Sequence, residues 1–412
     1  MTSIQKRLDK MEIQFDLEEF VVLDIGTGFI KAGFSGEDLP RVVIPTCIGE
    51  MEKKIEEAQG GQTMEVKAKT LYEYGNGAIA NAPPNGEFKF FEPVERGVVQ
   101  DLDRLEKLLD HIFTNELKVK TSSMNLLMTD APGNSKEKKK ALCDLMFEKF
   151  KIASFSLQNT ASLSLFSTGT TTGLVAECGH GLSYAVPVFE GFALPHAIHR
   201  IEIAGQDITM KLMKEIQNGG ESRLENHHAH LVREMKEQMC HVSMNYESES
   251  KSRDDVLNQE QRSYELPSGE IIEVDQRKRI AASEIIFDPR YCDNQEQARC
   301  EGIAQIAFNA IEKCDPDLKI NLYNNIVLAG GTTLMNGFTD RFDQEIRSHA
   351  EHSAKTDINV SAALHRKYAA WMGGSMLASF STFGDTTIKQ QDWSESGQDA
   401  DRGNCILKKT LF

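Results

Sequence analysis

Apolar residues near the start of the chain predict two β-strands joined by a glycine turn. Residues 20–23 form an apolar run, Gly26 and Gly28 interrupt it, and the apolar pattern resumes over residues 29–34. Two such runs around a glycine-rich turn predict a β-hairpin whose turn backbone can face a ligand. The charged residues ahead of this hairpin predict a partly helical tail.

The segment after residue 100 combines helical and strand patterns. Residues 103–117 and 136–150 carry apolar side chains at helical spacing, and Ser135 stands where the second helix would begin. Residues 125–129 form an apolar run of strand length between them. Strands alternating with helices predict an α/β unit.

The second half of the chain repeats this beginning. Residues 173–177 and 182–189 are apolar runs on either side of a second glycine turn at residues 179–181. Both turns have an acidic-x-Gly-x-Gly pattern, which starts at Asp24 in the first and at Glu177 in the second. Two like hairpins in one chain predict two duplicated α/β lobes that face each other across a cleft.

The remaining pattern is less regular. Further helices are expected at residues 208–217, 230–244 and 303–313, a hairpin at 264–274, a strand at 325–328, and a third glycine turn from Gly330 to Thr333 that opens another helix. Residues 51–87 are instead rich in lysine, glutamate, glycine and proline, which predicts a small polar insertion with mobile loops.

Composition narrows the class of protein. The chain has 412 residues, 40% of them hydrophobic, which suits two or three domains with real cores and argues against wholesale disorder. Its net charge of −16 argues against general binding to nucleic-acid phosphates. It has no apolar run long enough to span a membrane and no secretory signal, and its eight cysteines form no C-x-x-C pair. We therefore expect reduced thiols and a cytosolic or nuclear protein.

The first glycine turn could bind phosphate. Backbone N–H groups at Gly26 and Gly28 can approach phosphate oxygens, Thr27 adds a hydroxyl and Lys31 a positive charge, while Asp24 could hold a water-coordinated Mg²⁺. One such motif can equally be an ordinary hairpin turn. Two facing turns instead predict a two-sided phosphate clamp with carboxylates for a metal, and the third turn offers small residues on which a flat base could lie. None matches the Walker or Rossmann pattern.

These motifs resemble actin and the actin-related proteins over nearly the whole chain from about residue 20. Segments that carry the resemblance, in the family's order, include VVLDIGTGFIKAGFSGEDLPR, FEPVERGVVQDLDRLEKLLDHIFTNELKV, TTTGLVAECGHGLSYAVPVFEGFALPHAI, NNIVLAGGTTLMNGF and RKYAAWMGGSMLASFSTF. The resemblance implies an actin-like ATPase fold: two duplicated α/β domains, each with a peripheral subdomain, around a cleft that holds ATP or ADP with Mg²⁺. The implied boundaries are 1–45, 93–167 and 368–412 for subdomain 1, 46–92 for subdomain 2, 168–203 and 300–367 for subdomain 3, and 204–299 for subdomain 4.

The resemblance also assigns site residues one by one. Asp24 and Glu177 take the metal-side positions. The positions that the family uses for the nucleotide are here Gly26, Thr27, Gly28, Lys31, Gly179, Gly181, Gly205, Asp207, Arg233, Lys236, Glu237, Gly330, Gly331, Thr332 and Lys367.

The positions implied in hydrolysis depart from the family pattern. Thr160 replaces the water-positioning glutamine, and Tyr184 replaces the histidine that helps to orient the attacking water. Gln158 lies two residues earlier, about 200° around a helix from Thr160, so we expect it to face away. His180 and Met335 replace an aspartate of the second turn and the tyrosine beside the adenine. Because phosphoryl transfer depends on positioning and charge, we expect very slow or no ATP hydrolysis.

Other candidate sites have simpler interpretations. His227, His228 and His230 could suggest a metal site, but no cysteine or acidic residue stands at ligand spacing, so an exposed loop is expected. The lysine-rich residues 136–140 are expected to form the solvated face of their helix.

Two segments argue against a homopolymer. In actin a flexible loop grips a hydrophobic cleft of the next subunit, and the corresponding residues 50–69 are here highly charged. Residues 291–300 are also polar where actin has an apolar tip. We expect a structural subunit with dedicated protein partners in a cytoskeletal assembly in the cytoplasm, such as a ciliary one, with no direct nucleic-acid contact and no membrane insertion.

Three alternatives remain at this stage. The chain could be an unconventional polymerising actin with ATPase activity or an actin-related subunit of a chromatin remodeller in the nucleus. A sugar or glycerol kinase on the same scaffold fits less well, because no sugar-reading site is evident.

Overall fold

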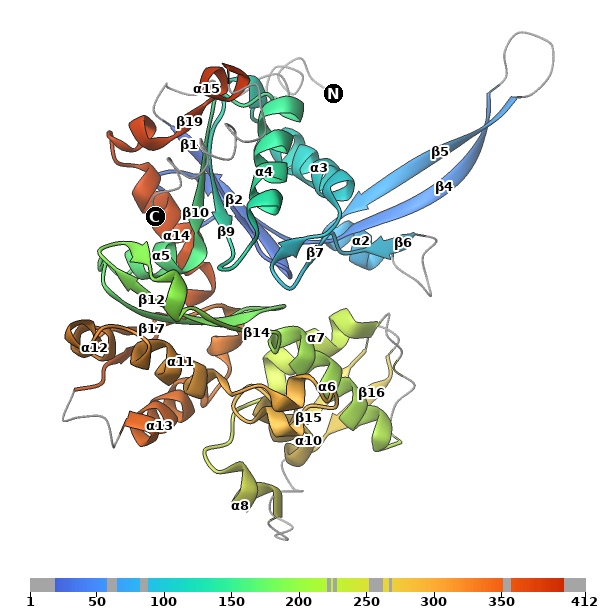
Figure 1. Cartoon of the computed structure of the whole chain (residues 1–412). Helices are drawn as coiled ribbons and strands as arrows, with labels where there is room; N and C mark the ends of the chain where they lie inside the picture. The colour runs from blue at the N-terminus through green and yellow to red at the C-terminus, as the bar shows by residue number, and fades with distance from the viewer. Residues whose placement is uncertain are drawn as a thin grey trace.

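Two similar β-sheets, one in each half of the chain, organise the protein (Figure 1). The structure, a computed structural model, describes residues 19–57, 65–81, 88–220, 224, 228–251, 262–266, 269–350 and 357–395. The first sheet has the strand order β19-β10-β9-β1-β2-β3. Its strands are β1 (Phe20–Ile25), β2 (Phe29–Phe34), β3 (Val42–Pro45), β9 (Asn125–Asp130), β10 (Ser154–Asn159) and β19 (Ile388–Lys389).

The second sheet repeats the topology of the first. Its order is β13-β12-β11-β17-β18, with β14 paired to β12. In each sheet an antiparallel hairpin, β1–β2 or β11–β12, lies beside two parallel strands, β9–β10 or β17–β18. The predicted duplication of two α/β lobes is therefore confirmed. The strands are β11 (Gly173–Cys178), β12 (Ser183–Phe189), β13 (Phe192–Ala193), β14 (His199–Ile201), β17 (Ile326–Ala329) and β18 (Val360–Ser361).

Two helices lie between the sheets and position the lobes. These are α5 (Thr160–Phe166) and α14 (Ala369–Ala378). On one side, Leu163 packs with Val22 of the first sheet, and on the other, Leu165 packs with Val175 of the second. The two helices approach closely at Gly373, where an added Cβ would lie 1.8 Å from the carbonyl oxygen of Leu163.

The helices predicted in the first lobe are present and cover its sheet. Asp101 and Ser135 cap α3 (Leu102–His111) and α4 (Lys136–Asp144), since each side chain accepts a hydrogen bond from a backbone N–H of its helix. Both helices continue into single π-helical turns, Ile112–Glu116 and Leu145–Lys149. Their apolar faces bury against β1, β9 and β10.

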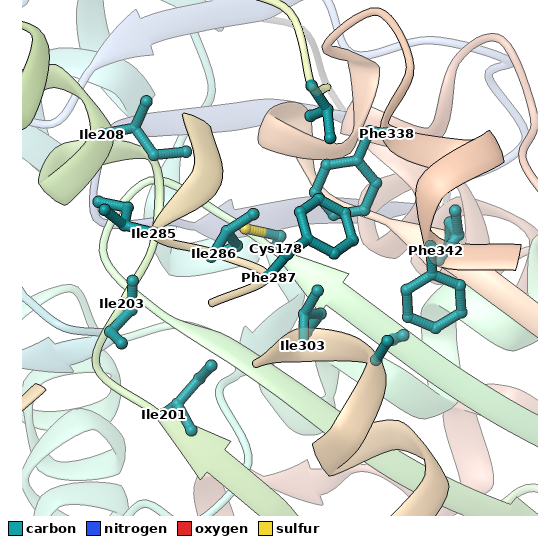
Figure 2. Close-up of a cluster of buried hydrophobic side chains, with 14 of the residues drawn as sticks. Cys178, Ile201, Ile203, Ile208, Ile285, Ile286, Phe287, Ile303, Phe338 and Phe342 are labelled. Carbon is teal, nitrogen blue, oxygen red and sulfur yellow. The ribbon is translucent and has the colours of Figure 1, made fainter. Parts of the chain in front are cut away.

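The second lobe encloses a large apolar core. Cys178 on β11, Phe287 and Phe338 belong to it (Figure 2). The surrounding elements are α6 (Gly205–Asn218), α7 (Ala229–Met239), α8 (Tyr246–Lys251), β15 (Arg262–Glu265), β16 (Ile271–Val274), α10 (Gln276–Glu284), α11 (Ile303–Glu312), α12 (Pro316–Tyr323) and α13 (Phe338–Ala350). In the first lobe α15 (Gln390–Glu395) buries Trp393.

Three local expectations are wrong. Within residues 51–87, β4 (Ile48–Glu57) and β5 (Glu65–Tyr74) form a long antiparallel ribbon that projects from the body, and α2 (Asn76–Ala80) follows it (Figure 1). The helix expected to reach residue 244 ends at Met239, because Cys240 is extended and His241 bridges to Asn336. The third glycine turn opens a 3₁₀ turn, Gly331–Leu334, before α13 begins at Phe338.

Short elements complete the described chain. They are β6 (Lys89–Phe91), β7 (Val94–Glu95), β8 (Val98–Val99) and the 3₁₀ turns Thr121–Ser123, Pro195–Ala197, Pro289–Tyr291, Gln297–Arg299, Arg366–Tyr368 and Phe383–Thr386. Among the described residues no helix is both long and apolar enough to cross a membrane. The N-terminal tail, residues 58–64 of the predicted polymer-contact loop, and the C-terminal end lie outside the described residues. The four subdomain boundaries stay a prediction.

Candidate functional site

A cavity of about 570 Å³ lies between the two lobes. All three glycine turns line it, together with residues from α5, α7 and the segment around Lys367. This volume is in the range of about 300–1,000 Å³ that small-molecule sites occupy. The predicted cleft between duplicated hairpins is therefore present.

The first two turns approach so closely that they need glycine. An added Cβ at Gly28 would lie 2.8 Å from Cβ of His180, and one at Gly181 would lie 2.7 Å from the Cγ2 methyl of Thr27. The hydroxyl of Thr27 accepts a hydrogen bond from the backbone N–H of Gly97 at 2.9 Å. Small residues thus keep the two turns in contact and leave the cavity open between their backbones.

The third turn depends on backbone conformation. Gly330 has a φ of 87°, and an added Cβ would lie 2.3 Å from the carbonyl oxygen of Cys178. Thr332 in the same turn donates a hydrogen bond to the carbonyl oxygen of Gly179 at 2.7 Å. The three turns therefore form one connected wall.

The two metal-side carboxylates both have protein partners. Lys31 Nζ lies 2.7 Å from Oδ2 of Asp24, and Thr129 donates a hydrogen bond to Oδ1 of Asp24 at 2.7 Å. The hydroxyl of Tyr184 donates to Oε2 of Glu177 at 2.6 Å, and Ser164 donates to the same oxygen at 3.4 Å. Burial raises the pKa of Glu177, the hydrogen bond from Tyr184 opposes this, and the negative charge of Asp24 adds to it.

Thr160, Tyr184 and Glu177 form a chain of hydrogen bonds. Thr160 Oγ1 lies 2.7 Å from the Tyr184 hydroxyl oxygen. A phenol has one hydrogen, which Tyr184 gives to Glu177, so Thr160 must donate to Tyr184. Burial and the negative charge of Glu177 raise the pKa of Tyr184 well above 10, so the phenol stays protonated.

A buried lysine faces the cavity from α7. Lys236 is 5% exposed, and its ammonium donates to the carbonyl oxygen of Gly205 at 3.3 Å. Burial lowers its pKa and the charge of Glu237 opposes this, although no carboxylate of the described residues lies within ion-pair distance of it. A buried ammonium without a carboxylate is costly, so an anionic ligand in the cavity would stabilise it.

Arg233 and His180 add to the positive side of the cavity. Arg233 lies 3.5 Å from Glu237 on the same helix and 4.2 Å above the ring of Phe29. Burial lowers the pKa of His180 to about 3, with further contributions from the positive charges of Lys236, Arg233 and Arg96. His180 is therefore neutral near pH 7.

The structure brings most of the predicted site residues together. The cavity lining includes Asp24, Gly26, Thr27, Gly28, Lys31, Thr160, Glu177, Gly179, Gly181, Tyr184, Arg233, Lys236, Glu237, Gly330, Gly331, Thr332 and Lys367, and also Met335. Their roles toward a nucleotide stay predictions.

Two predicted residues do not line the cavity. Gly205 lies behind the second turn, where its N–H donates to the carbonyl oxygen of Gly179. Asp207 forms an ion pair with Arg96 at 2.6 Å. Gln158 is also absent from the lining, although for a different reason from the one expected: it lies on β10, not on a helix, and its amide donates to Ser156.

Sequence reasoning missed other lining residues. Ser164 stands four residues after Thr160 on α5, so helical spacing could have found it. Arg366 lines the cavity beside Lys367, and its guanidinium donates to the carbonyl oxygen and hydroxyl of Thr333. Nothing in the sequence pattern connects Arg366 to Thr333.

No group of three or more metal-ligating side chains occurs among the described residues. His227 lies outside them, while His228 and His230 stand at the start of α7. Of the two predicted metal-side carboxylates, Asp24 is paired with Lys31 and Glu177 accepts a hydrogen bond from Tyr184, so neither stands open to a divalent ion.

The family model described as Actin matches residues 16–406, which include every site residue described above.

Proposed function

Since this chain belongs to the actin family, we propose that it is an adenine-nucleotide-binding structural subunit of a larger cytoskeletal assembly. The observation that carries the proposal is the interlobe cavity with three glycine turns and the buried Lys236. Glycine turns present backbone N–H groups to phosphates, and the ammonium supplies charge. A nucleotide at a concentration far above its Kd would stabilise the closed two-lobed form by several kcal/mol, even if it is never hydrolysed.

Hydrolysis by this site is very slow or absent. The hydroxyl hydrogens of Thr160 and Tyr184 are both committed, one to Tyr184 and the other to Glu177. A protonated phenol cannot accept the proton of an attacking water near neutral pH. Losing groups that position water and move its proton costs on the order of 10²–10⁴ in rate.

A binding titration and single-turnover hydrolysis with labelled ATP test both parts. We expect the wild-type protein to bind ATP and to leave it intact for hours. The double variant Thr160→Gln/Tyr184→His should hydrolyse at least about tenfold faster, and Thr168→Gln, on the loop after α5, should match the wild type. Hydrolysis by the wild-type protein at the rate of conventional actin filaments would contradict slow turnover, and no binding would contradict the site itself.

The subunit role is favoured over a homopolymer by the β4–β5 ribbon. On β4 the charged side chains of Glu52 and Lys53 are exposed, whereas Glu50 pairs with Arg104 of α3 within the chain. A charged ribbon of this kind is better suited to bind a partner surface of complementary charge than an apolar cleft. We expect purified protein to stay in the supernatant in magnesium and salt, whereas pelleting as helical filaments would favour the unconventional polymerising actin.

The assembly is proposed to be cytoplasmic and cytoskeletal, with a ciliary complex as one candidate. Tagging the chain in cells and identifying the proteins that co-purify would test this. Axonemal partners would support the proposal, and chromatin-remodelling subunits in the nucleus would overturn it.

A further inference from the structure

One of the two metal-side carboxylates, Asp24, is already paired with a cation of the protein. Asp24 has both carboxylate oxygens engaged, one by the Lys31 ammonium and the other by Thr129. A divalent cation that bound Asp24 directly would have to displace the Lys31 ammonium, which lies 2.7 Å from Oδ2. Mg²⁺ needs near-ideal octahedral geometry and sheds water reluctantly, so it competes poorly with a cation that is built into the site.

The second turn offers little compensation. Oε2 of Glu177 accepts hydrogen bonds from Tyr184 and Ser164. His180, between the two glycines of the same turn, supplies no negative charge. Glu177 is therefore the one metal-side carboxylate that has no paired cation among the residues that the structure describes.

Cationic side chains outnumber acidic ones around the cavity. The five cationic lining residues are Lys31, Arg233, Lys236, Arg366 and Lys367. The three acidic ones are Asp24, Glu177 and Glu237. Lys236 is buried without a carboxylate partner among the described residues, and Lys367 lies 4.7 Å from the ring centre of Tyr368. The negative charge of a polyphosphate would be balanced by this excess of positive side chains, whereas a divalent ion would increase the positive charge further.

We propose that the cavity binds its nucleoside polyphosphate without a divalent cation, with Lys31 neutralising Asp24 and Lys236 supplying charge that a metal would otherwise supply. The inference rests on the proposed nucleotide site and deepens it, because it specifies the metal-free form of the ligand. It removes Mg²⁺ from the requirements of the site.

The test is a fluorescence titration of the full chain with a fluorescent ATP analogue, once in EDTA and once in excess Mg²⁺. The dissociation constant measured in EDTA should be lower than the one measured in Mg²⁺, or equal to it to within about threefold. Binding that is at least about tenfold weaker in EDTA overturns the inference and leaves the nucleotide site standing. No binding in either buffer overturns the proposed function as well.

A variant with an added negative charge should instead bind the nucleotide in a metal-dependent way. His180→Asp adds a carboxylate at the second turn, so binding should become at least about tenfold weaker in EDTA than in Mg²⁺. His196→Asp adds the same charge at an exposed position outside the cavity lining and should behave as the wild type. Equal metal dependence of the two variants would overturn the electrostatic argument.

Metal content gives a second readout that needs no variant. Wild-type protein is loaded with ATP and Mn²⁺, desalted, and assayed for bound nucleotide and manganese. We expect nucleotide with far less than one manganese ion per bound molecule. A one-to-one ratio overturns the inference.

Discussion

Arg96 and Asp207 join the two lobes through a bidentate ion pair. Nη1 and Nη2 of Arg96 lie 2.6 and 2.8 Å from the two carboxylate oxygens of Asp207, and Nη1 also donates to the carbonyl oxygen of Gly181 at 3.1 Å. Arg96 belongs to the turn after β7 in the first lobe, while Asp207 lies in the first turn of α6 in the second. Arg200 of the second lobe adds another hydrogen bond between the lobes, because it donates to the carbonyl oxygen of Arg96 at 2.7 Å.

Removing this ion pair should loosen the lobes around the cavity. Arg96→Ala leaves Asp207 partly buried without its arginine, so we expect a loss of stability of about 1–3 kcal/mol. We also expect faster dissociation of a bound fluorescent ATP analogue, because the second turn loses its link through Gly181. Thermal unfolding and stopped-flow displacement measure the two effects.

A matched control separates this link from a general loss of charge. Lys251 pairs with Glu247 on the exposed face of α8, within one lobe. Lys251→Ala should change stability by less than about 0.5 kcal/mol and leave the dissociation rate unchanged. Equal effects of the two variants would contradict a specific role for Arg96.

Stability of the ligand-free protein should fall in mild acid because of His180. Its pKa is lowered to about 3 in the folded protein, mainly by burial and then by Lys236, Arg233 and Arg96, while the unfolded chain titrates near 6.5. Between these values the unfolded state binds more protons, so stability is present above pH 6.5 and is lost as the pH falls toward 3. Measured by urea unfolding, the free energy of unfolding at pH 5 should be about 1–2 kcal/mol lower than at pH 7 because of this group.

The variant His180→Gln isolates that contribution. It lacks the titrating imidazole, so its stability should fall less than that of the wild type between pH 7 and pH 5. Parallel pH profiles for the two proteins would mean that His180 takes up its proton as readily in the folded state as in the unfolded one.

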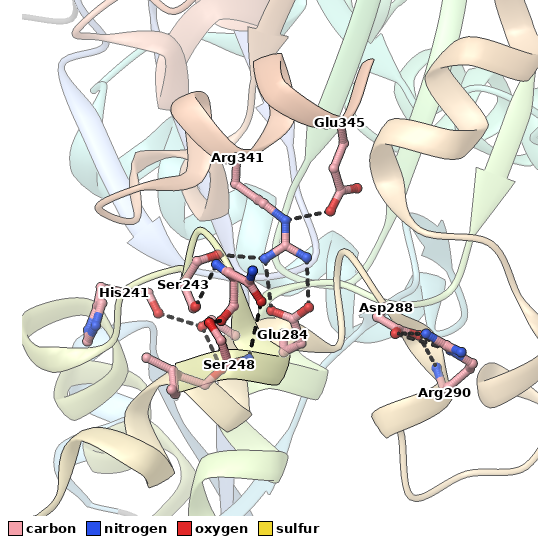
Figure 3. A network of polar contacts seen from close by, with 11 residues as sticks. His241, Ser243, Ser248, Glu284, Asp288, Arg290, Arg341 and Glu345 are labelled. Carbon is pink, nitrogen blue, oxygen red and sulfur yellow. Dashed lines mark hydrogen bonds and ion pairs between the residues drawn. The ribbon is translucent and has the colours of Figure 1, made fainter. Parts of the chain in front are cut away.

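A buried ion pair holds α13 against α10 (Figure 3). Arg341 is 9% exposed and Glu284 2% exposed, and the guanidinium also donates to Glu345 and to the carbonyl oxygen of Ser243. Arg341→Met would leave the Glu284 carboxyl buried without a cation. We expect a loss of about 3–5 kcal/mol in denaturant unfolding.

Two further variants test the cause of that loss. Arg347→Met, on the same helix, removes an exposed arginine that pairs with the half-buried Asp343, and it should cost about 1 kcal/mol or less. The double variant Arg341→Met/Glu284→Met removes both charges and should recover most of the stability lost by Arg341→Met alone. A double variant no more stable than the single one would show that packing, not the unpaired carboxyl, explains the loss.

Close packing of α5 on α14 should make Gly373 intolerant of a side chain. The Cβ of Gly373→Ala would lie 1.8 Å from the carbonyl oxygen of Leu163, so the helices must separate, at a cost of about 1–3 kcal/mol or more. Gly384→Ala meets no atom within 4 Å and serves as the control. A lower melting temperature for Gly373→Ala alone is expected, and equal melting temperatures would contradict this packing argument.

Local patterns in the sequence determined the two hairpins, the glycine turns and the capped helix after Ser135. These features depend on neighbours a few residues away: Gly26 and Gly28 allow a tight turn, and a serine side chain satisfies the first N–H groups of a helix. The duplicated lobes followed from the same patterns, since the two acidic-x-Gly-x-Gly turns repeat. Most residues that the sequence assigns to the nucleotide site therefore do line the cavity, and their roles there stay predictions.

Only the tertiary structure decided how those residues are paired. Asp207 meets Arg96 across 111 positions of the chain, and Thr160 meets Tyr184 across 24, so no local pattern could predict either contact. The β4–β5 ribbon was missed because charged, glycine-containing sequence favours loops, whereas pairing along ten residues of each strand stabilises a hairpin. Hydrogen bonds and ion pairs between distant residues form only once packing has brought their elements together, and for that reason the chemistry of this cavity comes from the fold.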